Sequence, residues 1–165
     1  MSRRAHTLAE QFEQANAEFM SFVARISDDE WRLLCPSEGR TVAALAHHVA
    51  AGYPFEIRVF NAIVAGKPLP VLSRAALDAM NAADGAAHAG SDRAETLELL
   101  RANGASAATF VRDLNDDDLT RTGAYIEGIP AMSVDQWIER VLIGHIRGHL
   151  ASMRAVVENP TRTVS

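Results

Sequence analysis

Two histidines, His145 and His149, stand four residues apart in the stretch 133–157. Residues at this spacing on an α-helix lie one turn apart on the same face, with Cβ atoms about 5–6 Å from each other. The other residues of that face recur at spacings of three and four and are mostly apolar: Ile138, Val141, Leu142, Ser152, Met153 and Val156. An imidazole on such a face needs hydrogen-bond partners or a metal ion, because an unpaired buried polar group costs about 1–3 kcal/mol. The pair therefore predicts either a shared metal ion or two hydrogen-bonded core histidines.

A third candidate ligand, His48, lies in the stretch 41–50. His48 follows Leu45 by three residues and belongs on the inward face of a helix, whereas His47 falls beside it, toward a flank. If this helix neighbours the helix of 133–157, three neutral imidazoles meet in the interior. Such a group is a facial site for a divalent cation such as Zn²⁺ or Ni²⁺, with water in the open positions. Open positions are more typical of a catalytic site than of a structural one.

Other metal motifs that contain histidine do not fit the sequence. A zincin needs Glu directly after the first histidine of H-E-x-x-H, and Ile146 stands there. A di-iron carboxylate bundle needs Glu-x-x-His pairs, and no histidine of this chain has Glu three residues before it. The metal hypothesis therefore concerns a site made of three histidines.

Four long amphipathic helices are expected to position these residues. Their apolar residues recur with helical periodicity over residues 7–26, 41–64, 91–114 and 133–157. Each stretch opens on a side chain that can cap the first turn, namely Thr7, Thr41, Ser91 and Ser133, with Glu10 and Gln136 completing capping boxes in the first and last.

Shorter features are expected between and within these helices. Gly52 and Pro54 interrupt the second helix, and Pro54 should kink it about one turn upstream. A short turn of helix is expected from Ser27 to Leu34. Residues 74–83 could form another, and a break is expected between Gly85 and Gly90. The acidic run 115–118 is a solvated turn or the first turn of a short helix.

No stretch of the sequence is a convincing strand. Four long helices without strands predict an all-α fold, a four-helix bundle with short extra helices in its connections. At 165 residues the chain is the size of one domain. We expect residues 1–158 to form that single domain and residues 159–165 to be a flexible C-terminal tail.

Composition excludes several classes of protein. A net charge of −5 argues against nucleic-acid binding, which usually requires a concentrated basic face. No run of eighteen apolar residues exists, so no membrane-spanning helix is expected, and the first residues show no signal peptide. Cys35 is the lone cysteine, which rules out an internal disulfide and fits a reducing cytoplasm. A cytoplasmic protein with no nucleic-acid or membrane partner is expected.

The paired motifs resemble those of a known family. Thr-Val-x-x-hydrophobic-x-His-His-Val-Ala at 41–50, followed by His-x-x-x-His at 145–149, resembles the DinB-like superfamily. That group includes YfiT-type proteins and the N-terminal domain of mycothiol-dependent maleylpyruvate isomerase. The similarity extends from the first helix to about Val157. One departure is Arg40, because family members often have Trp just before the Thr-Val pair, and it is expected to change the mouth of the site.

The resemblance implies a fold, a ligand set and a chemistry. The fold is a four-helix bundle of up-down-down-up order, and the metal ligands, carried over by position, are His48, His145 and His149. Homodimers are frequent in the family. Where activity is known, its chemistry uses low-molecular-weight thiols such as bacillithiol or mycothiol.

These features together lead to a first hypothesis, a metal-dependent thiol S-transferase or isomerase acting on a small molecule. The metal would bind the thiol and hold it as the nucleophilic thiolate. Arg58 and Arg147 are candidate partners for a substrate carboxylate, because guanidinium binds carboxylate in a bidentate fork. The hydroxyl of Tyr53 is a third candidate substrate contact.

Three other interpretations stay open at this point. The same ion could activate water, which would make the protein a hydrolase. The bundle could bind metal without turnover, as an interaction module. Finally, the histidines could be hydrogen-bonded core residues of a helical dimer that binds no metal.

Overall fold

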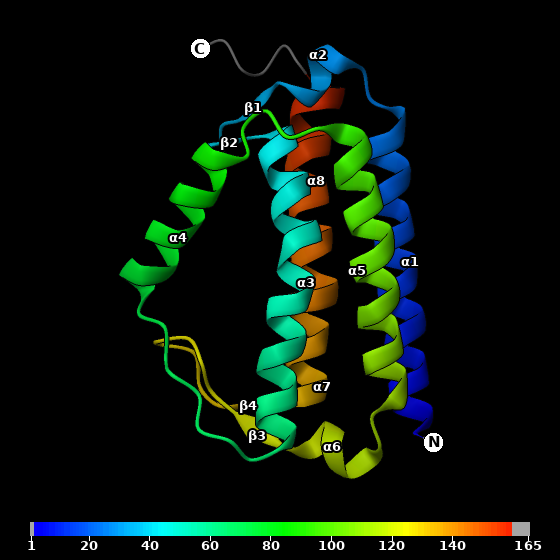
Figure 1. The fold of residues 1–165 in the computed structure, drawn as a ribbon, viewed down its shortest axis with the longest axis vertical. Helices are drawn as coiled ribbons and strands as arrows, with labels where there is room; N and C mark the ends of the chain where they lie inside the picture. The colour runs from blue at the N-terminus through cyan, green and yellow to red at the C-terminus, as the bar shows by residue number, and fades with distance from the viewer. Residues whose placement is uncertain (1, 160–165) are drawn as a thin grey trace.

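Helices make up most of residues 2–159, the part of the chain that this computed structural model describes (Figure 1). Three of the long segments are single helices, α1 (Arg3–Arg25), α3 (Val42–Val64) and α5 (Arg93–Asp113). The fourth is a continuous run of α7 (Val134–Trp137), the π-helix η1 (Ile138–Gly144) and α8 (His145–Glu158). The expected all-α class is confirmed.

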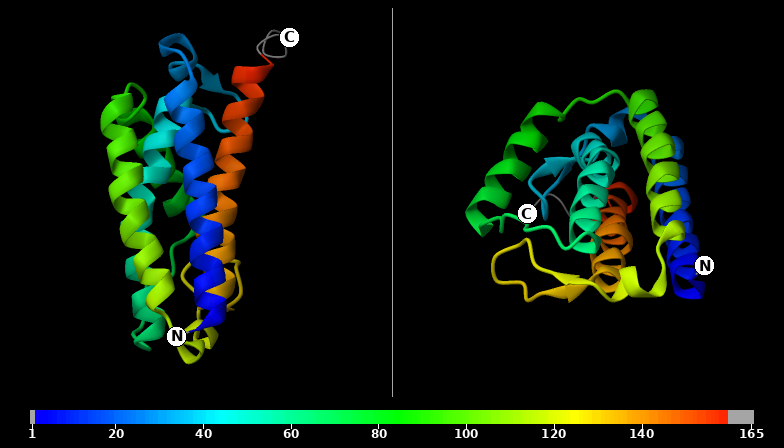
Figure 2. Two further views of the ribbon diagram at one scale, coloured as in Figure 1. Left: turned by 90° about the vertical axis from the view of Figure 1, so that its right-hand side faces the viewer. Right: turned by 60° about the horizontal axis from the view of Figure 1, so that its bottom comes forward.

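The four long segments enclose one apolar core. α1 packs against α5, α5 against α3, α3 against α8, and α8 against α1. Figure 1 shows α1 and α8 ascending while α3 and α5 descend, and Figure 2 shows the same segments side by side from two further directions. The large, fully buried side chains include Phe12, Phe19, Phe22, Leu45, Phe60, Leu100, Trp137, Leu142, Ile146 and Met153. Burying each such side chain contributes roughly 1.5–3 kcal/mol, so apolar contacts hold the scaffold together.

Two helices begin at residues other than those expected. α1 begins at Arg3, where the hydroxyl of Ser2 accepts a first-turn amide hydrogen. Thr7, the expected cap, lies inside that helix and donates to the carbonyl of Arg3. The cap of α5 is Asp92 rather than Ser91. In both places several capping side chains lie close together, and the sequence alone does not select among them.

The second long helix is capped as expected but is not interrupted. The hydroxyl of Thr41 accepts from the third amide of α3, and the helix then continues through Pro54. Proline has no N–H to offer the carbonyl four residues earlier, which belongs to Ala50. The side chain of Asn103, on α5, donates to that carbonyl at 2.9 Å. A neighbouring helix thus supplies the missing hydrogen bond, which a local sequence pattern cannot anticipate.

The connections contain short elements that the sequence indicates only in part. The expected short helix after Ser27 is present as α2 (Asp28–Trp31), and the acidic run forms the first turn of α6 (Asp116–Thr120). The absence of strands was a wrong expectation at two small antiparallel pairs, β1 (Leu34–Cys35) with β2 (Arg40–Thr41), and β3 (Thr122–Gly123) with β4 (Met132–Ser133). Strands of two residues are too short to leave an alternating pattern. The β1–β2 turn lies close to α8 and to the start of α3.

The longest helix outside the four long segments is α4 (Arg74–Ala87), which contacts α3 and β2 (Figure 1). The break expected between Gly85 and Gly90 is present, because α4 ends at Ala87. Gly85 itself lies inside α4, where a Cβ atom would lie 2.7 Å from the side chain of Arg40, so the glycine allows a close approach. The chain before α4 is joined to residues 125–127 by hydrogen bonds of Leu72. α4 and the segments joined through Leu72 therefore cover one side of α3.

None of the helices described has the length and apolarity needed to cross a bilayer. The expected tail, residues 159–165, lies outside the described residues apart from Asn159.

Candidate metal centre

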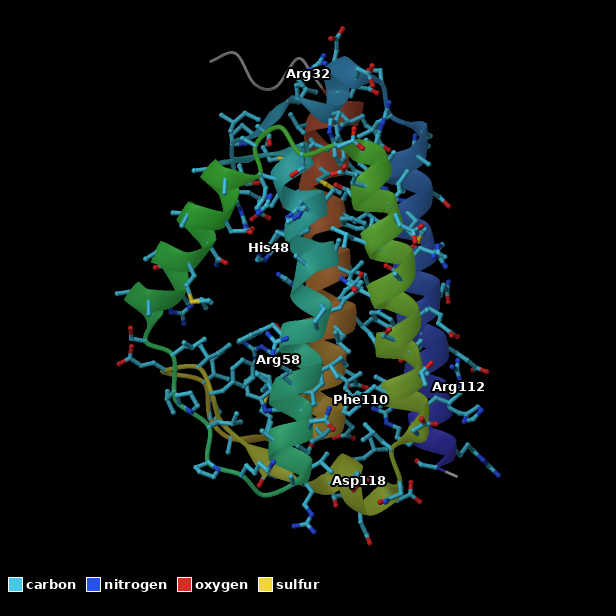
Figure 3. The ribbon with its side chains drawn as sticks, viewed as in Figure 1. Arg32, His48, Arg58, Phe110, Arg112 and Asp118 are labelled. Carbon is cyan, nitrogen blue, oxygen red and sulfur yellow. The ribbon has the colours of Figure 1, made fainter. Side chains whose placement is uncertain are left out.

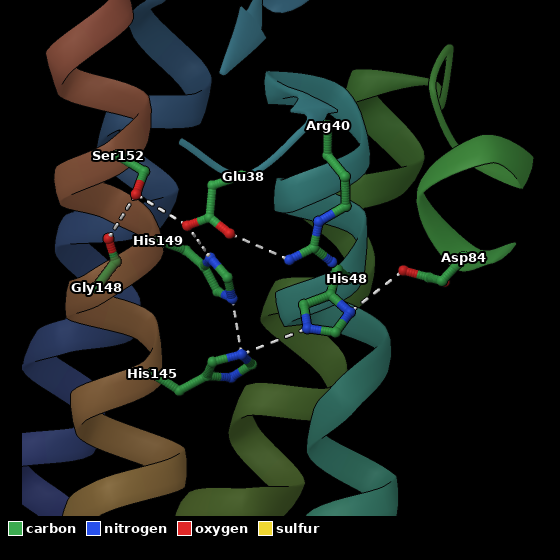
Figure 4. A network of polar contacts seen from close by, with 8 residues as sticks. All are labelled: Glu38, Arg40, His48, Asp84, His145, Gly148, His149 and Ser152. Carbon is green, nitrogen blue, oxygen red and sulfur yellow. Dashed lines mark hydrogen bonds and ion pairs between the residues drawn. The ribbon is translucent and has the colours of Figure 1, made fainter. Parts of the chain in front are cut away.

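The three histidines that the sequence singled out converge between α3 and α8 (Figure 4). The Nε2 atom of His145 lies 3.3 Å from Nε2 of His48 and 2.7 Å from Nε2 of His149. His48 comes from α3, whereas His145 and His149 lie one turn apart on α8. Two segments nearly one hundred residues apart in the chain therefore bring three ring nitrogens to a common point.

The opposite nitrogens of two of these rings face carboxylates. Nδ1 of His48 lies 3.2 Å from Oδ2 of Asp84 on α4, and Nδ1 of His149 lies 3.0 Å from Oε1 of Glu38. A carboxylate accepts a hydrogen from Nδ1, which leaves a lone pair on Nε2 pointing at the common point. Carboxylates in this position are characteristic of metal-binding histidines, whose tautomer and ring orientation they fix.

This arrangement fits a metal ion better than it fits hydrogen bonding within the triad. With hydrogens on both Nδ1 atoms, His48 and His149 present only acceptors to His145. The single hydrogen that neutral His145 could carry on Nε2 would have to be shared between them. A divalent cation can accept all three lone pairs at once. Nitrogen ligands about 2.0–2.1 Å from a tetrahedral zinc ion lie about 3.3 Å apart. The spacing of 3.3 Å between His48 and His145 matches this value, whereas the spacing of 2.7 Å between His145 and His149 is shorter.

The electrostatics of the site keep these rings neutral, the form that binds metal. Burial, and then the nearby guanidinium of Arg40, lower the pKa of His48 to about 4. Burial and the other two rings lower the pKa of His145 to about 3. The pKa of His149 is also lowered, mainly by burial, although Glu38 opposes that effect. All three are therefore unprotonated at neutral pH.

A second layer of polar contacts, which the sequence did not reveal, holds Glu38 in place. Glu38 accepts a hydrogen bond from the Ser152 hydroxyl at 2.9 Å and pairs with Arg40 at 3.3 Å (Figure 4). Burial acts to raise the pKa of Glu38, but the His149 ring and the hydrogen bonds from Ser152, His149 and Arg40 together lower it. Glu38 and Arg40 lie in and beside the β1–β2 turn. The only sequence signal was Arg40 itself, at a position where the family often has Trp.

The histidines open onto a cavity of about 380 Å³ between α3, α4 and the last helical segment. His48 and His145 contribute to its lining, together with Ala51, Gly52, Phe55, Glu56, Leu72, Leu77, Met80, Asn81, Asp84, Tyr125, Ile126 and Val141. Eight residues separate His48 from Glu56, about 12 Å along the helix axis. Burial raises the pKa of Glu56 to about 7, although a hydrogen bond from Tyr125 acts in the opposite direction. A half-buried carboxyl with a raised pKa in such a cavity is a candidate functional group that the sequence did not reveal.

The helix that carries two of the histidines is not regular. Ser133 and Gln136 are hydrogen-bonded as the expected capping box requires, with the Ser133 amide donating to Gln136 at 3.1 Å. The run Ile138–Gly144 is then π-helical, and it ends directly before His145. π-Helical segments often occur at functional sites. The hydrophobic spacing of residues 133–157 predicts a uniform α-helix, and it does not reveal the wider π-helical turns.

The three substrate contacts expected from the sequence lie outside the lining of this cavity. Tyr53 is buried in the core, where its hydroxyl donates to Asn16 at 2.8 Å. Arg58 is exposed and lines a separate apolar groove beside Phe55. Figure 3 shows Arg58 lower on α3 than His48. Arg147 is exposed on α8. A role for any of them in substrate binding stays a prediction.

A second group of possible ligands lies next to the triad. His47 stacks on His88, with ring centroids 3.6 Å apart and planes at 15°, and Nε2 of His88 lies 3.7 Å from Asp84. Two parallel stacked rings cannot both hold the same ion in their planes. We therefore interpret this group as a contact that fastens α4 to α3.

These observations define an all-α protein with a three-histidine site at one end of a largely apolar cavity. The sequence model of the DinB superfamily matches residues 11–153, most of the chain, so the protein belongs to that superfamily. No curated protein and no solved structure matches it.

Proposed function

We propose that this protein is a metal-dependent enzyme that transfers or isomerises a small molecule with the help of a low-molecular-weight thiol. The ligands of the metal, zinc or nickel, are His48, His145 and His149. The observation that carries the proposal is the convergence of three Nε2 lone pairs at the end of a cavity large enough for a small substrate. Membership in the DinB superfamily supports the same assignment.

The chain's own residues have separate roles in this scheme. Asp84 and Glu38 hold two of the rings in the orientation and tautomer that ligation needs. Apolar side chains such as Leu77 and Ile126 line the cavity and exclude water from a reacting thiol. When bound, a divalent ion would lower the pKa of that thiol and hold it as thiolate.

Metal content tests the first half of the proposal. Protein purified without a histidine tag should contain about one zinc or nickel ion per chain by mass spectrometry, and His145→Ala should lose it. His6→Ala is the matched control, because His6 lies on α1 outside the triad. Wild-type protein that binds neither ion would exclude the metal site and support hydrogen-bonded core histidines.

Turnover tests the second half. The metal-loaded protein should conjugate bacillithiol, mycothiol or glutathione to an electrophile such as a chloronitrobenzene, and His48→Ala should abolish that activity. Hydrolysis of esters or amides without any thiol would favour the alternative, a metal-dependent hydrolase. A bound metal without either reaction would identify a non-catalytic metal-binding module.

Two further proposals concern the state of the protein in the cell. The family resemblance leads us to propose a homodimer, for which sedimentation velocity should give twice the chain mass of 17.9 kDa. The lone Cys35 leads us to propose a cytoplasmic location, which fractionation of the source cells would test.

A further inference from the structure

The far end of the cavity from the histidines carries a carboxyl group without a charged partner. Glu56 receives a hydrogen bond at Oε2 from the hydroxyl of Tyr125, at 2.9 Å. Tyr125 is buried, so this contact fixes the carboxyl from one side. Among residues 2–159, no Lys, Arg or His forms an ion pair with Glu56, and its other oxygen has no hydrogen-bond partner.

The cavity is lined by acidic side chains without cationic ones to balance them. Its lining includes two carboxyl groups, Glu56 and Asp84, and neither lysine nor arginine. Asp84 is already paired with His48. The nearest arginine along α3, Arg58, lines the separate groove instead. A carboxylate in apolar surroundings is costly unless a cation compensates it, and the lining of this cavity offers no Lys or Arg side chain to do so.

We propose that Glu56 is the binding site for a positively charged group of the substrate, an ammonium at the end of an apolar body. Phe55, Leu72 and Leu77 would contact the apolar part, while the other end of the molecule reaches His48 and His145. The axial separation of about 12 Å along α3 sets the approximate length of such a molecule. This inference rests on the proposed function only for the reaction at the histidine end. It makes the substrate a cationic amphiphile rather than a carboxylate.

A structural role for Glu56 is the competing interpretation. The bond from Tyr125 could simply anchor the loop between β3 and β4 to α3. In that case loss of either partner should affect stability alone, with no change in which ligands bind. The raised pKa of Glu56, about 7, agrees with an unpaired carboxyl, and a bound ammonium would lower it.

Binding of three matched probes tests the proposal. Hexylamine, hexanol and hexanoate share an apolar chain and differ in the charge of the end group. We expect hexylamine to bind wild type at pH 8 at least about tenfold more tightly than hexanoate, measured by calorimetry. Glu56→Gln should remove this preference and leave hexanol binding unchanged. Glu10→Gln, which removes an exposed carboxylate on α1, is the control for net charge.

A second variant covers the case in which Glu56→Gln folds poorly. Tyr125→Phe removes the hydrogen bond but keeps the carboxylate, so it should retain the preference for hexylamine. Equal binding of all three probes to wild type, or equal loss of preference in Tyr125→Phe and Glu56→Gln, would overturn the proposal.

The same titrations in metal-free and zinc-loaded protein separate the two proposals. A preference for hexylamine without any zinc binding would disprove the metal centre and support the Glu56 site. Zinc binding with thiol turnover but no preference among the probes would support the metal centre and disprove the Glu56 site.

Discussion

Two buried polar clusters of this protein differ in how completely their hydrogen bonds are satisfied. The first lies in the core, where the buried Asn16 of α1 connects three helices. Its amide nitrogen donates to the Leu100 carbonyl of α5 at 3.2 Å, and its oxygen accepts from Tyr53 of α3 at 2.8 Å. Gly104 gives it room, because a Cβ atom there would lie 2.4 Å from the Asn16 nitrogen. Every strong donor and acceptor of this cluster points at a complementary group.

The second cluster is the histidine triad, which has more acceptors than hydrogens. Carboxylates take the Nδ1 hydrogens of His48 and His149, so three Nε2 atoms face one another with at most one hydrogen among them. A satisfied network such as that of Asn16 stabilises the fold by itself. An under-satisfied network is costly unless a ligand completes it. This difference separates a structural polar cluster from one arranged to bind a ligand.

The largest effect is expected from breaking the satisfied cluster. Asn16→Ala should lower the free energy of unfolding by about 3 kcal/mol, because it leaves the buried Tyr53 hydroxyl without an acceptor and removes the link to the Leu100 carbonyl of α5. Metal content should not change. Urea denaturation measures the first quantity and mass spectrometry the second. Gln14→Ala, at an exposed position of α1, is the control. A loss of bound metal with unchanged stability would reverse the roles assigned to the two clusters.

The triad is expected to add stability only when zinc is bound, whereas the Asn16 cluster stabilises the metal-free protein. Zinc at one hundred times its dissociation constant should raise the free energy of unfolding by about 2.7 kcal/mol, because it binds only the folded state. His145→Ala should abolish that gain, yet its metal-free stability should change much less than that of Asn16→Ala. Thermal denaturation with and without zinc gives both quantities. Equal stabilisation of wild type and His145→Ala by zinc would place the binding site elsewhere.

The sequence was sufficient to find the triad because each of its members stands on a helix face defined by local spacing. His145 and His149 share a face by their separation of four, and Leu45 places His48 inward. The long helices follow from the same periodicity. Their ends were less predictable, since Ser2 and Asp92 compete with neighbouring capping residues.

The groups around the triad were not predictable, because tertiary contacts bring them there. Glu38 reaches His149 through a β-turn, and Asp84 reaches His48 from a helix outside the four long segments. The helix end between Gly85 and Gly90 was predictable, whereas the approach of Arg40 to Gly85 depends on a tertiary contact. Glu56 left no clear signal in the sequence, because eight residues after His48 is about 2.2 turns of helix, roughly 80° around the axis from His48.

Glu56 is less completely satisfied than the Asn16 cluster, because it has one hydrogen bond, from Tyr125, and no ion-pair partner among the described residues. Its titration should change the free energy of unfolding with pH. Its pKa is about 7 in the folded protein and near 4.5 when unfolded. The folded state therefore holds the proton more tightly, and this stabilising contribution is lost as pH rises from about 4.5 through about 7. The loss should be roughly 1–2 kcal/mol, less than the full shift implies because the carboxyl is partly exposed.

Glu56→Gln should remove this pH dependence. Denaturation at pH 5 and pH 8 should show a smaller decrease in stability for the variant than for wild type. The other titratable groups that line the cavity are Tyr125, Asp84, His48 and His145. Glu10→Gln is the control for carboxyl groups elsewhere in the protein. An identical decrease in wild type and Glu56→Gln would show that Glu56 does not titrate in this range.

The smallest effect is expected one contact further from the triad, at Ser152. Its hydroxyl donates to Glu38, which orients His149, and it also lies 3.3 Å from the Gly148 carbonyl of its own helix. Ser152→Ala should weaken zinc binding about three- to tenfold, since groups that support metal ligands usually affect affinity by up to about 10–100-fold. Its stability should stay within about 0.5 kcal/mol of wild type.

Ser106→Ala is the matched control for this last change. Ser106 is also helical and bonds the carbonyl four residues earlier, at 3.1 Å, but it has no carboxylate partner. Competition titration with a chromogenic zinc chelator would compare the two variants. A loss of affinity in Ser152→Ala alone means that the Glu38 contact transmits the effect to His149. Equal affinities in both variants would mean that Glu38 orients His149 without help from Ser152, and the network supporting the metal centre would then end at the carboxylate.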